Sequence, residues 1–150
     1  MQVKSLAVVL LLGCWTVAVT AGGNDDNPEL KKLQGTWKVV YEEDSGLKMP
    51  VKPEERFIFT GNKLLHKLGE KLAGEYLIKL VPSKMPAQMD LTGLKNTTPG
   101  LCLASYKFER SKLVLCTSFA VDGKRPVDFT TDGSNHYMLF YLEKVDSKEK

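Results

Sequence analysis

Residues 101–120 read LCLASYKFERSKLVLCTSFA, and this stretch decides the fold class of the chain. Two runs rich in apolar residues, 101–108 and 112–120, flank a short polar segment at Glu109, Arg110 and Ser111. Apolar runs of this length on either side of a few turn residues are typical of a β-hairpin. The stretch therefore predicts two antiparallel strands.

The same spacing of short strands and turns continues on both sides of the hairpin. Pairs such as Gly61-Asn62 and Asp132-Gly133 mark turns, and Asn27 and Pro28 favour one short helical turn over residues 28–33. Eight or nine short strands without a long helix favour an antiparallel sandwich or a closed barrel, and closure removes exposed edges. We predict an all-β, small antiparallel up-and-down barrel of about eight strands. The other strands are expected at 37–41, 57–59, 63–68, 72–81, 89–91, 127–130 and 136–144.

The last expected strand indicates which side chains point inward. Met138, Phe140 and Leu142 share one face, whereas Tyr137 and Tyr141 lie on the other, and we assign the first face to the interior. Such a barrel either holds one small ligand or is filled by its own side chains. Both alternatives stay open. The candidate lining residues for a ligand are Trp37, Tyr41, Phe57, Phe59, Tyr76, Tyr106 and Phe140, with Val39, Ile78 and Leu142 beside them.

The first 21 residues have the pattern of a secretory signal peptide. A basic start at Lys4 precedes an apolar run over residues 5–19, and small residues end at Ala21. The run is shorter than the ~20 residues of a membrane span. We expect a secreted, extracellular protein with no span after cleavage, a flexible segment at 22–29, one barrel domain at 30–145 and a charged tail at 146–150.

Secretion changes how the cysteines are interpreted. Cys14 leaves with the signal peptide, so Cys102 and Cys116 remain. Extracellular chains favour disulfides, but a two-residue turn in the hairpin would point these two side chains to opposite faces. A disulfide requires a three-residue loop or a bulge; otherwise both are small buried thiols. Asn96-Thr97-Thr98 is a sequon, which predicts a glycoprotein modified at Asn96.

Composition excludes several classes. The chain has 150 residues, 43% hydrophobic and 26% charged, with a net charge of +3, which suits one globular domain. That charge is too weak to predict nucleic-acid binding. His66 and His136 stand on separate expected strands, and the carboxylate pairs Asp25-Asp26 and Glu54-Glu55 fall in expected loops, where they indicate solvated surface. No metal, cofactor or catalytic motif is present, so we expect a non-enzymatic protein without cofactor or metal.

Several sequence blocks in one order resemble a lipocalin-like (calycin) domain family best known from planctomycete bacteria, whose function is uncharacterised. The resemblance covers about residues 30–144. It includes the lipocalin G-x-W signature at Gly35-Thr36-Trp37. The blocks are LQGTWKVV (33–40), RFIFTGNKL (56–64), GEY (74–76), Pro86 with MDLT (89–92), LVLC (113–116) and KRPVDF (124–129).

The resemblance implies a small calycin-type barrel. In lipocalins the signature tryptophan closes one barrel end beneath a C-terminal arginine; here Trp37 takes the first role and Lys144 the second. A lysine can still lie over an indole ring as a cation–π contact. Two functions are expected. One is a secreted lipocalin-like protein that binds a small hydrophobic molecule, and the alternative is a structural component of an extracellular matrix without a ligand.

Overall fold

The computed structural model describes residues 27–97, 100–118 and 123–146. The expected signal peptide lies outside these residues, as does the expected flexible segment up to residue 26. The expected tail is described only at Asp146. The elements are α1 (Pro28–Leu33), β1 (Gly35–Asp44), β2 (Leu47–Lys48), β3 (Glu55–Thr60), β4 (Lys63–Leu68), β5 (Lys71–Val81), β6 (Ala87–Lys95), β7 (Leu101–Glu109), β8 (Lys112–Ser118) and β9 (Met138–Lys144).

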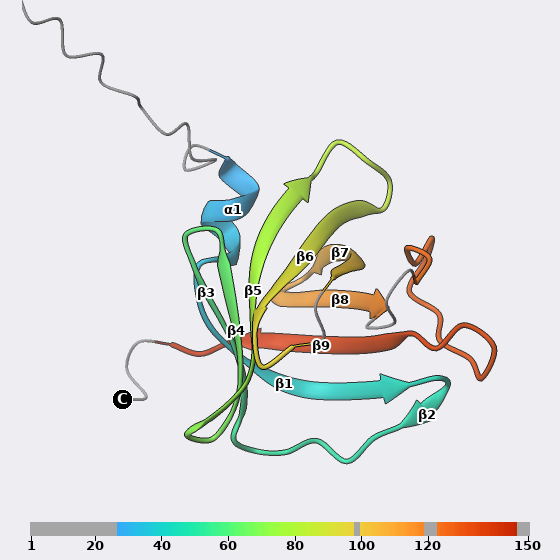
Figure 1. Ribbon diagram of the computed structural model, residues 1–150, viewed down its shortest axis with the longest axis horizontal. Helices are drawn as coiled ribbons and strands as arrows, with labels where there is room; N and C mark the ends of the chain where they lie inside the picture. The colour runs from blue at the N-terminus through green and yellow to red at the C-terminus, as the bar shows by residue number, and fades with distance from the viewer. Residues whose placement is uncertain (1–26, 98–99, 119–122, 147–150) are drawn as a thin grey trace, which may run out of the picture.

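Eight of the strands form a closed antiparallel barrel (Figure 1). Strands β1 and β3 to β9 each pair with the next along the chain, and β9 returns to pair with β1. Closure leaves none of these eight strands with an unpaired edge. The short strand β2 extends the end of β1 as a small hairpin. The predicted fold class is confirmed, including the short helix before the first strand.

Helix α1 and Trp37 close one end of the barrel. The Asn27 side chain accepts a hydrogen bond from the Glu29 amide and so caps the helix. Leu33 is fully buried, and its carbonyl oxygen accepts a 2.7 Å hydrogen bond from Trp37 Nε1. Lys144 Nζ lies 5.4 Å from the centre of the Trp37 ring. The end beside α1 is therefore filled by packed side chains.

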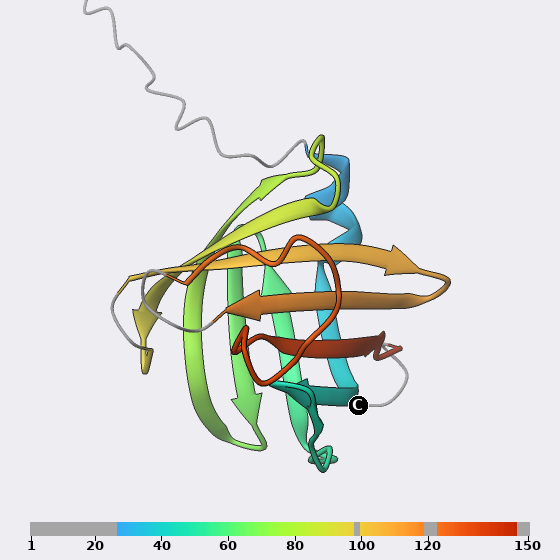
Figure 2. The same ribbon diagram turned by 90° about the vertical axis from the view of Figure 1, so that its right-hand side faces the viewer.

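Residues 123–137, which precede β9, cover part of the outer surface (Figure 2). In Figure 2 their orange-red ribbon crosses in front of β7 and β8. Arg125 forms an ion pair with Asp90 and donates to the carbonyl oxygen of Ala104, while Ser105 Oγ donates to that of Pro126. These contacts keep apolar side chains on the outside of β8 away from water.

A strand was expected at residues 127–130, and that prediction is wrong. Asp128 Oδ1 accepts hydrogen bonds from both the amide and the hydroxyl of Thr130, which folds this segment into a local turn. The ladder partners are also already taken, because β8 and β1 both pair with β9. The segment therefore packs on the barrel instead of joining it.

The two cysteines of the described chain are free. Glu109 pairs with Lys112, so the β7–β8 turn has two residues, and Ser105 is the partner of Cys116. Cys102 consequently belongs to the inner cluster and Cys116 to the outer one. The disulfide alternative is wrong for this geometry. Burial raises the pKa of the Cys116 thiol to about 12, so it stays protonated at neutral pH.

Candidate functional site

A β-bulge in β1 changes which side chains enter the barrel. Before the bulge, Val39 is the partner of Leu142 on the inner face. After it, Tyr41 is the partner of Tyr141 and Glu42 that of Phe140. Tyr41, which was expected to line the interior, therefore lies on the outer face, and the prediction for it is wrong. The extra residue breaks the alternation and turns a carboxylate inward.

Glu42 lines a cavity of about 400 Å³ together with Glu55 and His66. It comes from β1, Glu55 from the start of β3 and His66 from β4, all at the barrel end opposite α1. We call this space the mouth cavity. Its other lining residues are Lys52, Leu68, Ala73, Tyr76, Asn96, Thr97, Cys102, Met138 and Phe140.

Glu55 is the most buried of the three groups, with a residue exposure of 2%. His66 Nε2 donates a 2.7 Å hydrogen bond to Glu55 Oε1. The second oxygen, Oε2, is buried and has no hydrogen-bond partner within the described residues. A buried carboxylate oxygen without a partner is destabilising, because it has lost water and gained nothing in return. The residue that carries this oxygen lines the mouth cavity.

Two other buried side-chain atoms lack partners in the part of the chain that the structure describes. They are Tyr106 Oη and Thr117 Oγ1. Neither residue lines the mouth cavity, and Tyr106 is neutral, since burial raises its pKa to about 12. The Glu55 oxygen therefore differs from both, because it belongs to a carboxyl group of a residue that lines the cavity.

Aromatic packing fixes the orientation of His66. Its ring stacks on Phe57 with centroids 4.6 Å apart and planes 21° apart. Phe57 in turn lies 5.2 Å from Phe140, which lines the cavity. The imidazole is held from one face by the stack and from its edge by Glu55. Such a doubly held side chain presents its polar atoms in one geometry.

Glu42 has an unusual environment for a glutamate. Only 7% of the residue is exposed. Burial raises the pKa of its carboxyl group, and the nearby charge of Glu55 raises it further, while Lys52 and His66 act in the opposite direction. The carboxyl group of Glu42 is thus affected by both Glu55 and His66 across the mouth.

The predicted lining residues divide between the two ends of the barrel. Tyr76 and Phe140 line the mouth cavity, and Phe57 lies behind His66. The remaining inward-facing ones, Trp37, Phe59 and Tyr106, are buried in the inner core cluster and do not line this cavity. The interior is therefore both a packed core and a hollow, at different depths.

Sequence patterns missed the polar half of this site. Glu55 was interpreted as solvated surface together with Glu54; only Glu54 is exposed, so the prediction for Glu55 is wrong. A usable signal existed, because Glu55 precedes Phe57 and Phe59 at period two on one strand. His66 has the same relation to Leu64. Glu42 points into the interior only because of the bulge, and no sequence pattern predicts that bulge.

Asn96, the predicted glycosylation site, lies at the rim of the mouth. Its φ angle is 54°, and its side-chain Nδ2 donates a 2.9 Å hydrogen bond to the Leu72 carbonyl oxygen. Thr98, the third residue of the sequon, lies outside the described residues. Modification at Asn96 stays a prediction.

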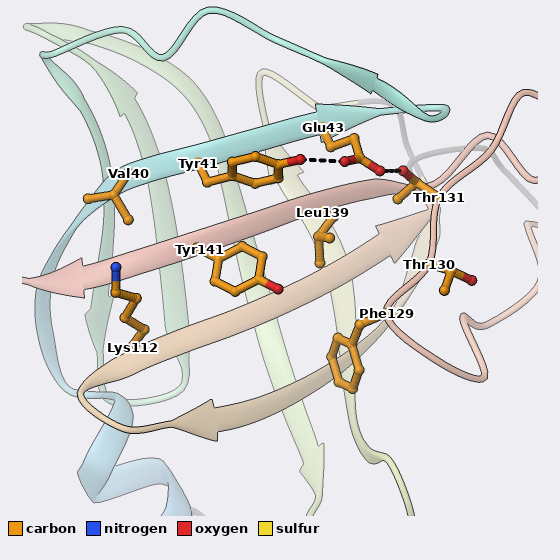
Figure 3. A pocket seen from close by; sticks show the side chains of 9 residues that line it. All are labelled: Val40, Tyr41, Glu43, Lys112, Phe129, Thr130, Thr131, Leu139 and Tyr141. Carbon is orange, nitrogen blue, oxygen red and sulfur yellow. Dashed lines mark hydrogen bonds between the residues drawn. The ribbon is translucent and has the colours of Figure 1, made fainter.

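A second hollow of about 630 Å³ lies on the outer surface (Figure 3). Tyr41, Leu139 and Tyr141 form its floor, and residues 129–131 its far side. Its carboxylate, Glu43, is fully engaged: Tyr41 Oη donates to one oxygen at 2.5 Å and Thr131 Oγ1 donates to the other. Among the described residues, none that lines the outer hollow has a buried side-chain acceptor without a partner, and in this it differs from the mouth cavity.

The described residues show neither a metal-binding cluster nor a membrane-spanning helix. Residues 27–97, 100–118 and 123–146 contain no group of three or more histidine, cysteine, aspartate or glutamate side chains arranged to hold a metal ion. Over the same stretches, no helix has the length and apolar character required to cross a membrane.

The chain matches no family model, no curated protein and no solved structure. No related protein therefore adds information about the barrel or its mouth cavity. The resemblance to lipocalin-like domains and the secretory localisation stay predictions from the sequence.

Proposed function

We propose that this protein is a secreted, lipocalin-like binding protein that holds one small organic molecule in the mouth cavity, without catalysis. The volume of about 400 Å³ falls in the usual range of ligand pockets, ~300–1,000 Å³. The observation that carries the proposal is Glu55 Oε2, a buried carboxylate oxygen that lacks a partner within the described residues. A ligand with a hydrogen-bond donor would supply that partner.

The walls of the cavity suit a molecule with a polar and an apolar part. Glu42, Glu55 and His66 gather on neighbouring strands β1, β3 and β4, whereas Met138 and Phe140 come from β9. Burial of the apolar part supplies the driving force, and a few placed polar groups fix the orientation. This division favours an amphipathic ligand over a uniformly hydrophobic one.

Native mass spectrometry of the protein purified from a secreting host tests the proposal. We expect a non-covalent adduct of small mass that is lost on denaturation. Ala73→Phe, which places a ring in the cavity, should abolish the adduct. Ile58→Phe adds the same ring to β3, where Ile58 lies outside the inner cluster, and should leave the adduct in place.

A clean apo mass, together with no thermal stabilisation by any member of a diverse small-molecule library, would contradict the proposal. An adduct that survives Ala73→Phe would place the ligand elsewhere, and the mouth cavity would not be the site.

A further inference from the structure

We infer that the ligand of the mouth cavity carries a protonated amine. This inference rests on the proposed function and names the chemical class of its ligand. It is carried by two carboxylates, Glu42 and Glu55, which line one small cavity with residue exposures of 7% and 2%.

The charges around the cavity favour a cation. The ionisable lining groups are Glu42 on β1, Lys52 before β3, Glu55 on β3, His66 on β4, Tyr76 on β5 and Cys102 on β7. Lys52 is exposed to solvent, where its charge is screened, whereas both carboxylates are buried. An anionic ligand such as a fatty acid would meet these carboxylates at close range and be repelled.

Hydrogen-bond chemistry leads to the same class. A carboxyl oxygen such as the unpartnered Glu55 Oε2 accepts a hydrogen bond, so it is matched by a ligand that donates one. An ammonium group offers three donors and a full charge, and hydrogen bonds between ions are stronger than those between neutral groups. Burial is the main cause of the raised pKa of Glu42, and a cation between the two glutamates would offset the repulsion from Glu55 that raises it further.

The aromatic side chains define the rest of the ligand. Tyr76 and Phe140 line the cavity, and the His66–Phe57 stack is adjacent. Ring faces attract cations and pack against apolar groups. Together with the volume of about 400 Å³, these walls suit an amine on a single aromatic ring or a short alkyl body.

Isothermal titration calorimetry with three matched probes tests the inference. The probes share a phenyl ring and a short alkyl chain, and end in an amine, an alcohol or a carboxylate: 2-phenylethylamine, 2-phenylethanol and 3-phenylpropanoate. We expect the amine to bind at least tenfold more tightly than the alcohol, and the carboxylate not to bind. Glu42→Gln and Glu55→Gln should each weaken the amine about tenfold or more.

Glu143→Gln serves as the matched control. It makes the same charge change on β9, but Glu143 pairs with Lys112 at 2.9 Å and does not line the cavity. We expect the amine affinity of this variant to equal that of the wild type. Glu55→Gln could fail to fold because its hydrogen bond to His66 is lost. In that case Glu42→Gln still tests the inference, since Glu42 does not make that bond.

The outcomes separate this inference from the proposed function. Three results would overturn the inference of an amine ligand but leave the proposed binding cavity: equal binding of all three probes, preference for the carboxylate, or an amine affinity unaffected by Glu42→Gln. A purified adduct identified as a molecule without an amine would do the same. Failure of every probe together with a clean apo mass would overturn both.

Discussion

The two ends of the barrel differ in what fills the interior: packed apolar side chains at one end and a cavity with polar walls at the other. At the closed end, α1, Trp37 and the surrounding apolar side chains leave the indole 3% exposed. At the mouth, two glutamates and a histidine face a cavity of about 400 Å³. Stability therefore concentrates at one end, while polar groups that disfavour folding collect at the other. Such a division is typical of proteins whose binding site is less stable than the rest of the fold.

The largest effect is expected at the closed end, from Trp37→Ala. Removing a buried aromatic side chain costs ~3–5 kcal/mol through lost burial and the cavity left behind. The substitution also removes the hydrogen bond that Trp37 Nε1 donates to Leu33. Urea unfolding followed by circular dichroism measures the loss. If the two ends are independent, the folded fraction of the variant still binds the amine probe with wild-type affinity.

A loss below ~1 kcal/mol would show that α1 and the indole do not anchor the barrel. A large loss of amine affinity in the folded fraction would show that the two ends are coupled.

Gly74→Ala is expected to have the next largest effect, and at the mouth. A Cβ atom there would lie 2.9 Å from the Tyr76 ring and hydroxyl, and 3.1 Å from Thr97. Tyr76 must move to relieve this overlap, and overpacking of this kind costs ~1–3 kcal/mol. Because Tyr76 lines the mouth cavity, its displacement should also reduce probe affinity several-fold. Thermal unfolding and calorimetry measure the two effects.

Gly61→Ala is the matched glycine control. A Cβ there meets nothing within 4 Å, although its φ of +56° makes the substitution strained. It should lower stability without changing probe affinity. Equal affinities for Gly74→Ala and Gly61→Ala would show that Tyr76 does not shape the cavity.

The contrast between the two ends also explains which parts of the molecule the sequence predicts. Alternating apolar residues such as Phe57 and Phe59 specify strands with one buried face, and tight turns order them, so the closed barrel follows. The mouth does not follow, because it depends on departures from that pattern. A bulge turns Glu42 inward at the mouth; on the outer surface, the loop over residues 123–137 likewise departs from the pattern and takes the place of an expected strand. Strand-pairing patterns do not predict at which residue a bulge or an irregular loop interrupts them.

Glu42→Gln is expected to stabilise the protein and weaken binding at once. Burial raises the Glu42 pKa in the folded state, so the folded chain holds this proton to higher pH than the unfolded chain does. The contribution of Glu42 to stability is complete below the ordinary glutamate pKa of ~4.3 and is lost as pH rises through the folded value. Glutamine removes this loss. At neutral pH the variant should gain stability within the ~1 kcal/mol of an ordinary single substitution.

Thermal unfolding from pH 4 to pH 7 measures the difference between this variant and the wild type. The advantage of the variant should grow as pH rises. An advantage that is constant with pH would mean that Glu42 does not titrate with folding and that its charge does not destabilise the mouth.

The smallest effect is expected from Lys144→Gln, which returns to the closed end. Lys144 Nζ lies 5.4 Å from the Trp37 ring centre and 3.4 Å from the Lys32 carbonyl oxygen, but the side chain is exposed. A cation–π contact at an exposed site contributes ~0.5–1 kcal/mol, so glutamine should lower stability by about that amount. Lys144→Arg keeps the charge over the ring and should retain wild-type stability. If glutamine and arginine behave alike in urea unfolding, the charge of Lys144 does not stabilise the closed end, which then depends on apolar packing and on the hydrogen bond from Trp37 to Leu33.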